Sequence, residues 1–263
     1  MSEQTLLQFV KSPPICVSLS IADVDSDFLG ITPKHYPPDT VFDRQGDTRP
    51  RVFIIKSGWV CISRHLSNGN RQIIDVPLAG DVLFIPSLDG GGANSLTSLS
   101  EVSVFEISGQ VFRKALDRHP MLSALFSRII ARQHSIAVER LTSVCRRNAL
   151  ERTAHYLLEL GERLGAAGAI TEHGYSCPLT QHDLADVLGL TQIHINRILR
   201  ELRERELVSF RAGTVEFLSR PKLVNLAGFE GGYLHYNWTY GLHQIGASRQ
   251  ASHHPPARKT FKT

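Results

Sequence analysis

A chain of 263 residues with 42% hydrophobic residues is long enough to form two domains, each with a core of its own. Its formal net charge of +4 is unevenly distributed. Residues 1–120 contain 11 Lys and Arg against 13 Asp and Glu, which gives −2, whereas residues 121–263 contain 18 against 12, which gives +6. A basic surplus confined to the C-terminal half is expected if that half binds a polyanion.

The four cysteines, Cys16, Cys61, Cys145 and Cys177, are dispersed and form no CxxC pair. This spacing favours reduced thiols and argues against a disulfide framework or a structural zinc site. The N-terminus shows no charged-then-apolar signal segment, and no apolar run approaches the roughly 20 residues that span a bilayer. We therefore expect a cytoplasmic protein that does not bind membranes.

After an N-terminal extension, residues 1–20, the region 21–120 consists of short β-prone runs broken by turn residues. The runs VFIIK, WVCIS and RQIIDVPL are separated by Ser57-Gly58 and by a turn that contains Asn68-Gly69. Asn-Gly favours the positive φ angles of a tight hairpin, and repeated short strands at this spacing are typical of a sandwich or barrel. The region predicts an antiparallel, jelly-roll-like β-roll with a sensing role.

The region 121–147 contains no Gly or Pro, and Leu122, Ile129 and Ile136 recur in it every seven residues. This pattern predicts a long helix that pairs with a copy of itself. The alternative is a helix packed on the core of its own domain, because polar residues interrupt the seam. The expected contact residues are Leu122, Phe126, Ile129, Gln133, Ile136 and Arg140.

The strongest signal lies in the region 148–227, in the stretch TQHDLADVLGLTQIHINRILRELRERELVSF from Thr180 to Phe210. Thr180 followed three residues later by Asp183 is a capping box that begins a helix. Gly189 ends that helix, since glycine adopts the left-handed conformation at low cost, and Thr191 caps a second one. Two short helices joined by so tight a turn predict a helix-turn-helix whose second helix enters the DNA major groove.

Polar side chains follow the flank of the second helix that lies off its apolar stripe. Arg pairs with guanine and Asn or Gln with adenine, while an apolar side chain such as Ile193 contacts a thymine methyl. The helix N-terminus favours a phosphate oxygen, and the strand pair LVSF and VEFLS would complete a wing. A helical hairpin with a merely solvated outer face is the alternative. The expected DNA contacts are Thr191, Gln192, Ile193, His194, Asn196, Arg197, Arg200 and Arg211.

This order of parts resembles the Crp/Fnr family of bacterial transcription regulators from about Ile21 to Ala227. LGLTxxxxxRxLxxLxxxxLV is similar to the winged helix-turn-helix of the family, and FIIKSGWVCI, LAGDVLF and SVFEIS resemble its β-roll. The resemblance implies a homodimer on an inverted repeat of double-stranded DNA, with half-sites about one turn apart, and RNA polymerase as a further candidate partner. It also implies that Arg197 contacts a guanine and Thr191 a phosphate. Many members have Glu where this chain has Ile193, so the half-site sequence should differ.

The effector of the β-roll is not evident from the residues. Family members that bind cyclic nucleotides use a Glu for the ribose and an Arg for the phosphate, and by the same resemblance these positions fall near Ile85 and Gly92. No Arg occurs between Gln72 and Phe112, and a buried phosphate without a cation is costly. We therefore expect that cyclic AMP does not bind in the usual way. With only Cys16 near the N-terminus, an iron–sulfur cluster is not expected, and we assign no cofactor and no metal.

Two other classes of protein fit this sequence less well than a DNA-binding regulator does. A cupin enzyme needs His-x-His, yet the β region up to Leu116 contains only His35 and His65, and no GxxxxGK[ST], GxSxG or HExxH motif is present. A ligand-sensing module that acts on a protein partner would need neither the base-reading flank nor the basic surplus. The sequence thus predicts a non-enzymatic α+β regulator whose last segment, 228–263, is a largely disordered tail. The sequence predicts neither an activator nor a repressor in particular.

Overall fold

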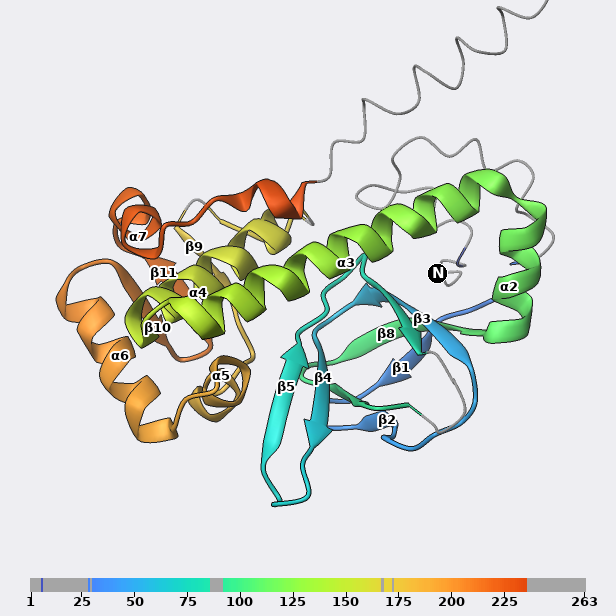
Figure 1. Cartoon of the computed structure of the whole chain (residues 1–263), viewed down its shortest axis with the longest axis horizontal. Coiled ribbons are helices and arrows are strands. Elements are labelled where there is room, and N and C mark those ends of the chain that lie inside the picture. Colours follow the sequence, from blue (N-terminus) through green and yellow to red (C-terminus); the bar gives the residue numbers. More distant parts are fainter. Residues whose placement is uncertain are drawn as a thin grey trace, which may run out of the picture.

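The computed structural model describes residues 6, 28, 30–85, 92–166, 168–171 and 173–235. Most of the expected N-terminal extension and the segment 236–263 lie outside this part of the chain. Figure 1 shows a β-roll on one side, a smaller unit of helices and short strands on the other, and one long helix, α3, that runs along both. Within the described ranges, no helix is long and apolar enough to cross a membrane.

The β-roll consists of two four-stranded sheets whose neighbouring strands are all antiparallel, as predicted. Of the Asn68-Gly69 pair, Gly69 alone has a positive φ, 82°. One sheet has the order β1 (Lys34–Tyr36), β8 (Val102–Ser108), β3 (Arg51–Ser57) and β6 (Val82–Ile85). The other has the order β2 (Val41–Asp43), β7 (Ser95–Ser98), β4 (Val60–His65) and β5 (Arg71–Asp75).

Strand β3 is buried on both faces because each face meets a different apolar layer. Phe53 and Ile55 point into the core between the two sheets, while Val52 and Ile54 join a second cluster with α2 (Gly109–Arg118). Side chains alternate along a strand, so a strand buried on both faces must be apolar at every position. The run VFII in β3 meets this requirement.

Two helices lead from the β-roll to the C-terminal unit. Helix α3 (Pro120–Arg146) has Pro at its first position, where the missing N–H costs nothing. Helix α4 (Ala149–Ala166) follows after two residues. Asn148 and Glu151 cap it reciprocally, since each backbone N–H donates to the other side chain at 3.0 Å. The helical conformation is therefore interrupted at Arg147, and α4 begins directly afterwards.

The C-terminal unit is built on α4 and a three-stranded sheet of order β10-β11-β9. Ordered packing continues past the boundary expected at residue 227, because Phe229 and Leu234 are buried. Residues 228–235 are therefore part of this packed unit, although the glycine-rich sequence placed them in the expected tail. The elements after α4 are β9 (Gly174–Ser176), α5 (Gln181–Leu188), α6 (Gln192–Glu204), β10 (Val208–Arg211), β11 (Thr214–Phe217), α7 (Arg220–Ala227) and the short 3-10 helix η2 (Gly231–Leu234).

Six charged side chains meet where the β-roll, α3 and α4 converge, and we call them the central ion cluster. Arg163 of α4 lies 3.2 Å from Asp75 and 2.9 Å from Asp81 of the β-roll. Burial alone would lower the pKa of Arg163, but the surrounding carboxylates reverse that effect and raise it. The members are Asp75, Asp81, Arg132, Arg140, Glu159 and Arg163.

Replacing Arg163 with Met should lower the free energy of unfolding by about 3–5 kcal/mol, because the substitution leaves buried carboxylates without a partner. Arg163 and Glu159 are 2% and 1% exposed, so water cannot compensate. A urea titration followed by circular dichroism measures the loss. The matched control is Arg205→Met, which removes an exposed pair with Glu201 and should cost less than about 1 kcal/mol. Equal losses in the two variants would contradict this account of the cluster.

Candidate nucleic-acid interface

Helices α5 and α6 form the predicted helix-turn-helix, and the local signals that define it are confirmed. Thr180 and Asp183 make the reciprocal hydrogen bonds of a capping box at 3.1 and 2.9 Å. Gly189 adopts the left-handed conformation with φ 63° directly after α5. The hydroxyl oxygen of Thr191 then accepts from the backbone N–H of His194 at 3.2 Å and begins α6.

Helix α6 packs against the rest of the C-terminal unit through an apolar stripe. It contacts α4, α5 and β10, so its axis is fixed by three elements. Such burial removes the stripe from water and leaves the opposite flank free for another molecule. The buried residues are Ile195, Ile198, Leu199 and Leu202.

The structure brings the expected contact residues of α6 together on one exposed flank. Ile193 is 68% exposed, which is unusual for a large apolar side chain on a helix and suits a surface that another molecule covers. Within the described part of the chain, the side chains of Asn196 and Arg197 have no hydrogen-bond or ion-pair partner. The exposed residues are Thr191, Gln192, Ile193, His194, Asn196, Arg197 and Arg200.

The wing is a tight hairpin between β10 and β11. Ala212 and Gly213 at its tip have φ angles of 48° and 71°, the two positive values that a type I′ turn needs. Arg211 precedes this turn and is exposed. The tip therefore presents one cation on the same unit as α6.

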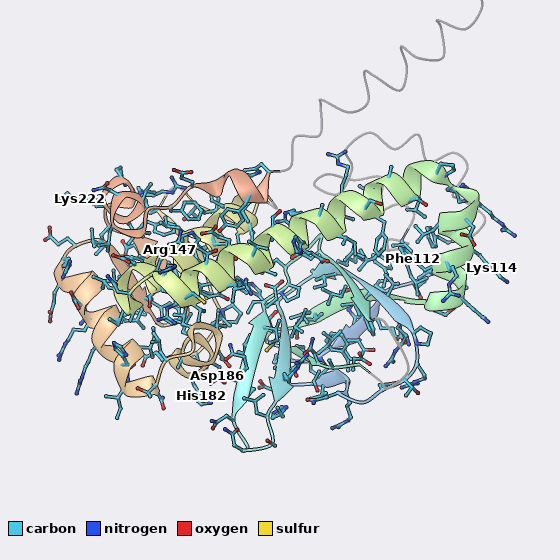
Figure 2. The ribbon with its side chains drawn as sticks, viewed as in Figure 1. Phe112, Lys114, Arg147, His182, Asp186 and Lys222 are labelled. Carbon is cyan, nitrogen blue, oxygen red and sulfur yellow. The ribbon has the colours of Figure 1, made fainter. Side chains whose placement is uncertain are left out.

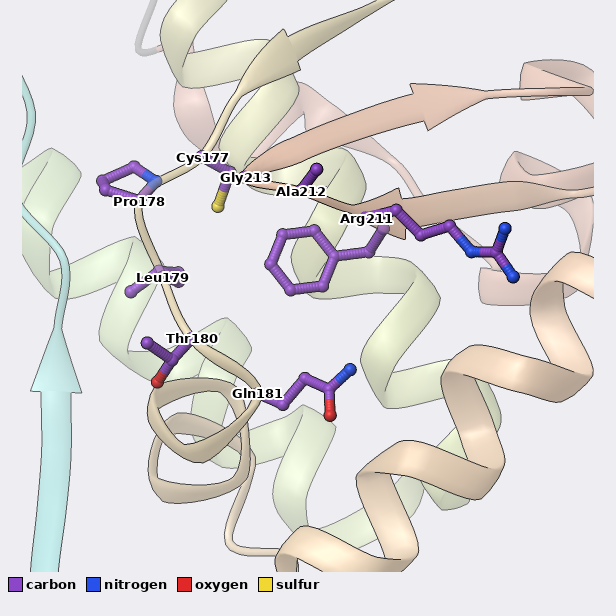
Figure 3. A pocket seen from close by; sticks show the side chains of 9 residues that line it. Cys177, Pro178, Leu179, Thr180, Gln181, Arg211, Ala212 and Gly213 are labelled. Carbon is purple, nitrogen blue, oxygen red and sulfur yellow. The ribbon is translucent and has the colours of Figure 1, made fainter.

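A hollow of about 430 Å³ separates the wing from the start of α5. Figure 3 shows Gln181 on the helix side of this hollow and Arg211 on the wing side. Gln181 was missed in the sequence because it is a single polar residue at a helix start. Cys177 also lines the hollow, but its side chain is buried, and burial raises the pKa of its thiol to about 12. The thiol is therefore unreactive at neutral pH.

The residues expected to pair α3 with its copy all face their own chain. Leu122, Phe126 and Ile129 pack in the cluster beneath α2, and Ile136 is buried in the apolar cluster that joins the β-roll to the C-terminal unit. Gln133 Nε2 donates to the Val82 carbonyl at 2.6 Å. Arg140 belongs to the central ion cluster. The alternative reading, a helix packed on its own domain, describes these six residues.

A second stripe of α3 faces outward, one residue away from the first. Its spacing alternates between four and three residues, which is the a and d spacing of a coiled coil. Leu141 is the most exposed large apolar residue of this stripe, at 65%. The outward stripe consists of Ile130, His134, Ala137, Leu141 and Val144, and Val138 beside it is 49% exposed.

The positions considered for a cyclic nucleotide, Ile85 and Gly92, border residues 86–91, which lie outside the described part of the chain. Gly92 is described there, and its backbone N–H donates to Asp47 O. Arg64 lies beside this position, where its Nε donates to the Ala93 carbonyl and to Asn94 Oδ1, whereas Arg71 pairs with two carboxylates of α5. Among the residues that the structure covers, no group of three or more His, Cys, Asp or Glu could hold a metal ion.

Comparisons with known proteins agree with this geometry. Residues 151–226 match the Crp-like helix-turn-helix domain, and residues 33–119 match the cyclic nucleotide-binding domain. The nitrogen fixation regulation protein FixK of Rhizobium meliloti is 30% identical over 194 residues, covering 73% of this chain and 85% of that protein. The transcriptional activator protein anr of Pseudomonas aeruginosa is 24% identical, covering 82% and 89%.

Solved structures show the same fold. The structure of FixK2 from Bradyrhizobium japonicum superposes with a TM-score of 0.66 at 24% identity and covers 74% of this chain and 96% of its own. These relatives are regulators rather than enzymes. Because a FixK protein 30% identical to this chain is covered over most of its length, and both halves match domains of that kind, the chain belongs to the Crp/Fnr family of transcription regulators and carries its helix-turn-helix DNA-binding domain.

Proposed function

We propose that this regulator binds an inverted-repeat DNA site as a homodimer and reads bases with the exposed flank of α6. One observation carries the proposal: the flank is exposed and mostly polar, and Asn196 and Arg197 on it have no partner among the described residues, while the opposite face of the same short helix is buried. A flank held this rigidly can present several hydrogen-bonding groups at once to base edges in a major groove.

Each residue of the flank has a role that follows from its chemistry. Arg197 pairs with guanine, and Asn196 or Gln192 with adenine. Ile193 contacts a thymine methyl, whereas Thr191 and His194 at the helix start lie near a phosphate. Arg200 and the wing residue Arg211 add contacts to the backbone of the DNA, and Gln181 joins them from across the hollow.

The homodimer forms through the outward stripe of α3. Three large apolar residues of this stripe and one beside it are 41–65% exposed in the single chain: Ile130, Leu141 and Val144, and the adjacent Val138. Pairing two such stripes in parallel buries this apolar surface and relates the two α6 helices by a twofold axis. This assignment replaces Leu122, Phe126, Ile129, Gln133, Ile136 and Arg140 as the contact residues, because those side chains are occupied within the chain.

The β-roll does not bind cyclic AMP in the usual way, because the sequence has no Arg between Gln72 and Phe112 to pair with the cyclic phosphate. The protein acts in the cytoplasm, where its thiols stay reduced and the DNA is accessible. RNA polymerase is the further partner that an activator requires, and the relatives named as transcriptional activators support that direction.

The experiment that tests this function is selection of bound sequences from a random DNA pool by the full chain without effector. An inverted repeat with half-sites one helical turn apart should be recovered, and its affinity should fall steeply with salt because phosphate contacts release counterions. Adding cyclic AMP should change neither the sequence nor the affinity. Enrichment of no sequence, or of a single half-site only, would contradict the proposal and favour a module that acts on a protein partner.

Arg197→Ala should weaken binding to the selected site by about 1–3 kcal/mol and relax the preference at one base pair, because one paired contact to a base is lost. Binding to the set of single-base variants of the site measures both effects. The control is Arg205→Ala, since Arg205 pairs with Glu201 at the far end of α6. If Arg197→Ala weakened binding equally on every sequence, its role would be a phosphate contact instead.

Leu141→Asp should shift the protein from dimer to monomer, because a charge on the outward stripe would be buried at the twofold axis. Analytical ultracentrifugation over a range of concentrations measures the shift. Leu66→Asp is the matched control, since Leu66 is 46% exposed but lies in the turn of the β4–β5 hairpin. A dimer that survives Leu141→Asp, with folding unchanged, would rule out this seam.

A further inference from the structure

The β4–β5 hairpin of the β-roll docks directly on α5, the first helix of the helix-turn-helix. Arg71, the first residue of β5, bridges two carboxylates one turn apart on α5. Its Nη2 lies 2.6 Å from Asp183 Oδ1, and its Nε lies 2.7 Å from Asp186 Oδ2. In Figure 2, Asp186 is seen where α5 approaches β5. These contacts join residues 112 and 115 positions apart in the sequence.

The ion pairs lie over additional contacts between the same two elements. Gln72 Nε2 donates to the Asp186 carbonyl at 2.6 Å. Beneath it, Ile73 and Val76 of the β-roll belong to the same buried apolar cluster as Val187 of α5. The interface therefore combines a hydrophobic base with a polar rim, as stable contacts between domains do.

Asp183 links this docking to the start of α5. Its Oδ2 accepts from the Thr180 backbone N–H and hydroxyl in the capping box, while its Oδ1 pairs with Arg71. Burial alone would raise the pKa of Asp183, but these hydrogen bonds and Arg71 outweigh it and lower the pKa. The carboxylate stays charged at neutral pH and holds both partners.

Docking α5 also fixes α6. The two helices are joined through Gly189 and contact each other along their apolar faces, so they move as one body. We propose that Arg71 is a positioning residue for DNA reading: by holding α5 against the β-roll of its own subunit, it sets the direction of α6 and hence the spacing between half-sites. This inference rests on the proposed function, because spacing has meaning only for a dimer on a repeat.

The geometry distinguishes this contact from an ordinary surface salt bridge. Exposed pairs contribute little because water screens them and long side chains lose entropy. Here the carboxylates of Asp183 and Asp186 are 9% and 14% exposed, and the guanidinium uses two different nitrogens for them. Asp186 Oδ2 also lies 3.6 Å from His182 Nε2 on the same helix, but His182 is largely exposed and does not reach the hairpin.

The test compares Arg71→Gln with the wild type on the selected repeat and on duplexes whose half-sites are one base pair closer or farther apart. One base pair rotates a half-site by about 35°, so a rigidly positioned reader must reject the altered duplexes. Arg71→Gln should lose about tenfold in affinity at the preferred spacing, within the range of known coupling effects. Its loss of affinity on altering the spacing should be smaller than that of the wild type.

Two measurements distinguish a positioning role of Arg71 from a direct contact between Arg71 and DNA. Affinity for a single half-site and the slope of affinity against salt should be unchanged in Arg71→Gln, since Arg71 touches no phosphate. Asp186→Asn should reproduce the effect, and the double variant should lose no more than either single one. The control is Arg64→Gln, which removes the same charge from the neighbouring strand of the hairpin, where Arg64 contacts Ala93 and Asn94.

Amide hydrogen exchange of the free protein tests the docking without DNA. Exchange in β5 and α5 should quicken in Arg71→Gln and Asp186→Asn but not in Arg64→Gln, with the thermal midpoint confirming that each variant folds. Unchanged exchange would overturn the inference whatever DNA site the wild type selects. Wild-type affinity and spacing preference in Arg71→Gln, or an equal loss on all duplexes, would overturn it as well. If the wild type selects no repeat from the DNA pool, that result contradicts the proposed function and not the docking of α5.

Discussion

The arrangement of the two halves depends on the central ion cluster. Arg163 of α4 and Arg140 of α3 share Asp75 of the β-roll, and Arg140 also pairs with Glu159 of α4 at 3.0 Å. Removing several charges from water costs as much as their attraction returns, so such a cluster adds little net stability. What it specifies is geometry, because apolar faces can slide whereas alternating charges satisfy one another in one register only. The cluster therefore determines how the β-roll, α3 and α4 meet.

Contacts around this cluster extend the register in opposite directions. Arg132 Nη1 reaches Asp81 at 2.9 Å, and its Nε donates to the Leu234 carbonyl, so the C-terminal segment is tied to the β-roll. Tyr233 donates to Glu159 at 2.8 Å from the same segment. On the other side, Arg71 ties α5 to β5. Two groups of contacts therefore connect the β-roll to the C-terminal unit, one through Arg132 and Tyr233 and one through Arg71.

Sequence reasoning succeeded where the signals are local. The capping box at Thr180, the left-handed Gly189 and the apolar stripe of α6 each depend on residues close together in the sequence, and all three are present. For α3 it selected the stripe that packs against its own chain, because Ile129 and Ile130 belong to two stripes of equal period. Only contacts distant in sequence, such as Gln133 with Val82, decide which stripe faces inward. The pairing of Arg71 with Asp186 leaves no local trace for the same reason, since neither residue is unusual in its own segment.

The outward stripe itself is uneven, and this bears on how dimerisation and DNA reading are linked. Leu141 and Val144 lie near the C-terminal end of α3, next to the break at Arg147, whereas His134 and Ala137 occupy its middle. In the proposed dimer, a polar residue at a core position weakens association but fixes register, and the large apolar side chains supply most of the affinity. The strongest contact between the two α3 helices would then lie beside Arg147, at the junction with α4. Association would bring together the C-terminal ends of the two α3 helices, from which α4 leads to the helix-turn-helix. The same contact would then hold the dimer together and determine the distance between the two α6 helices.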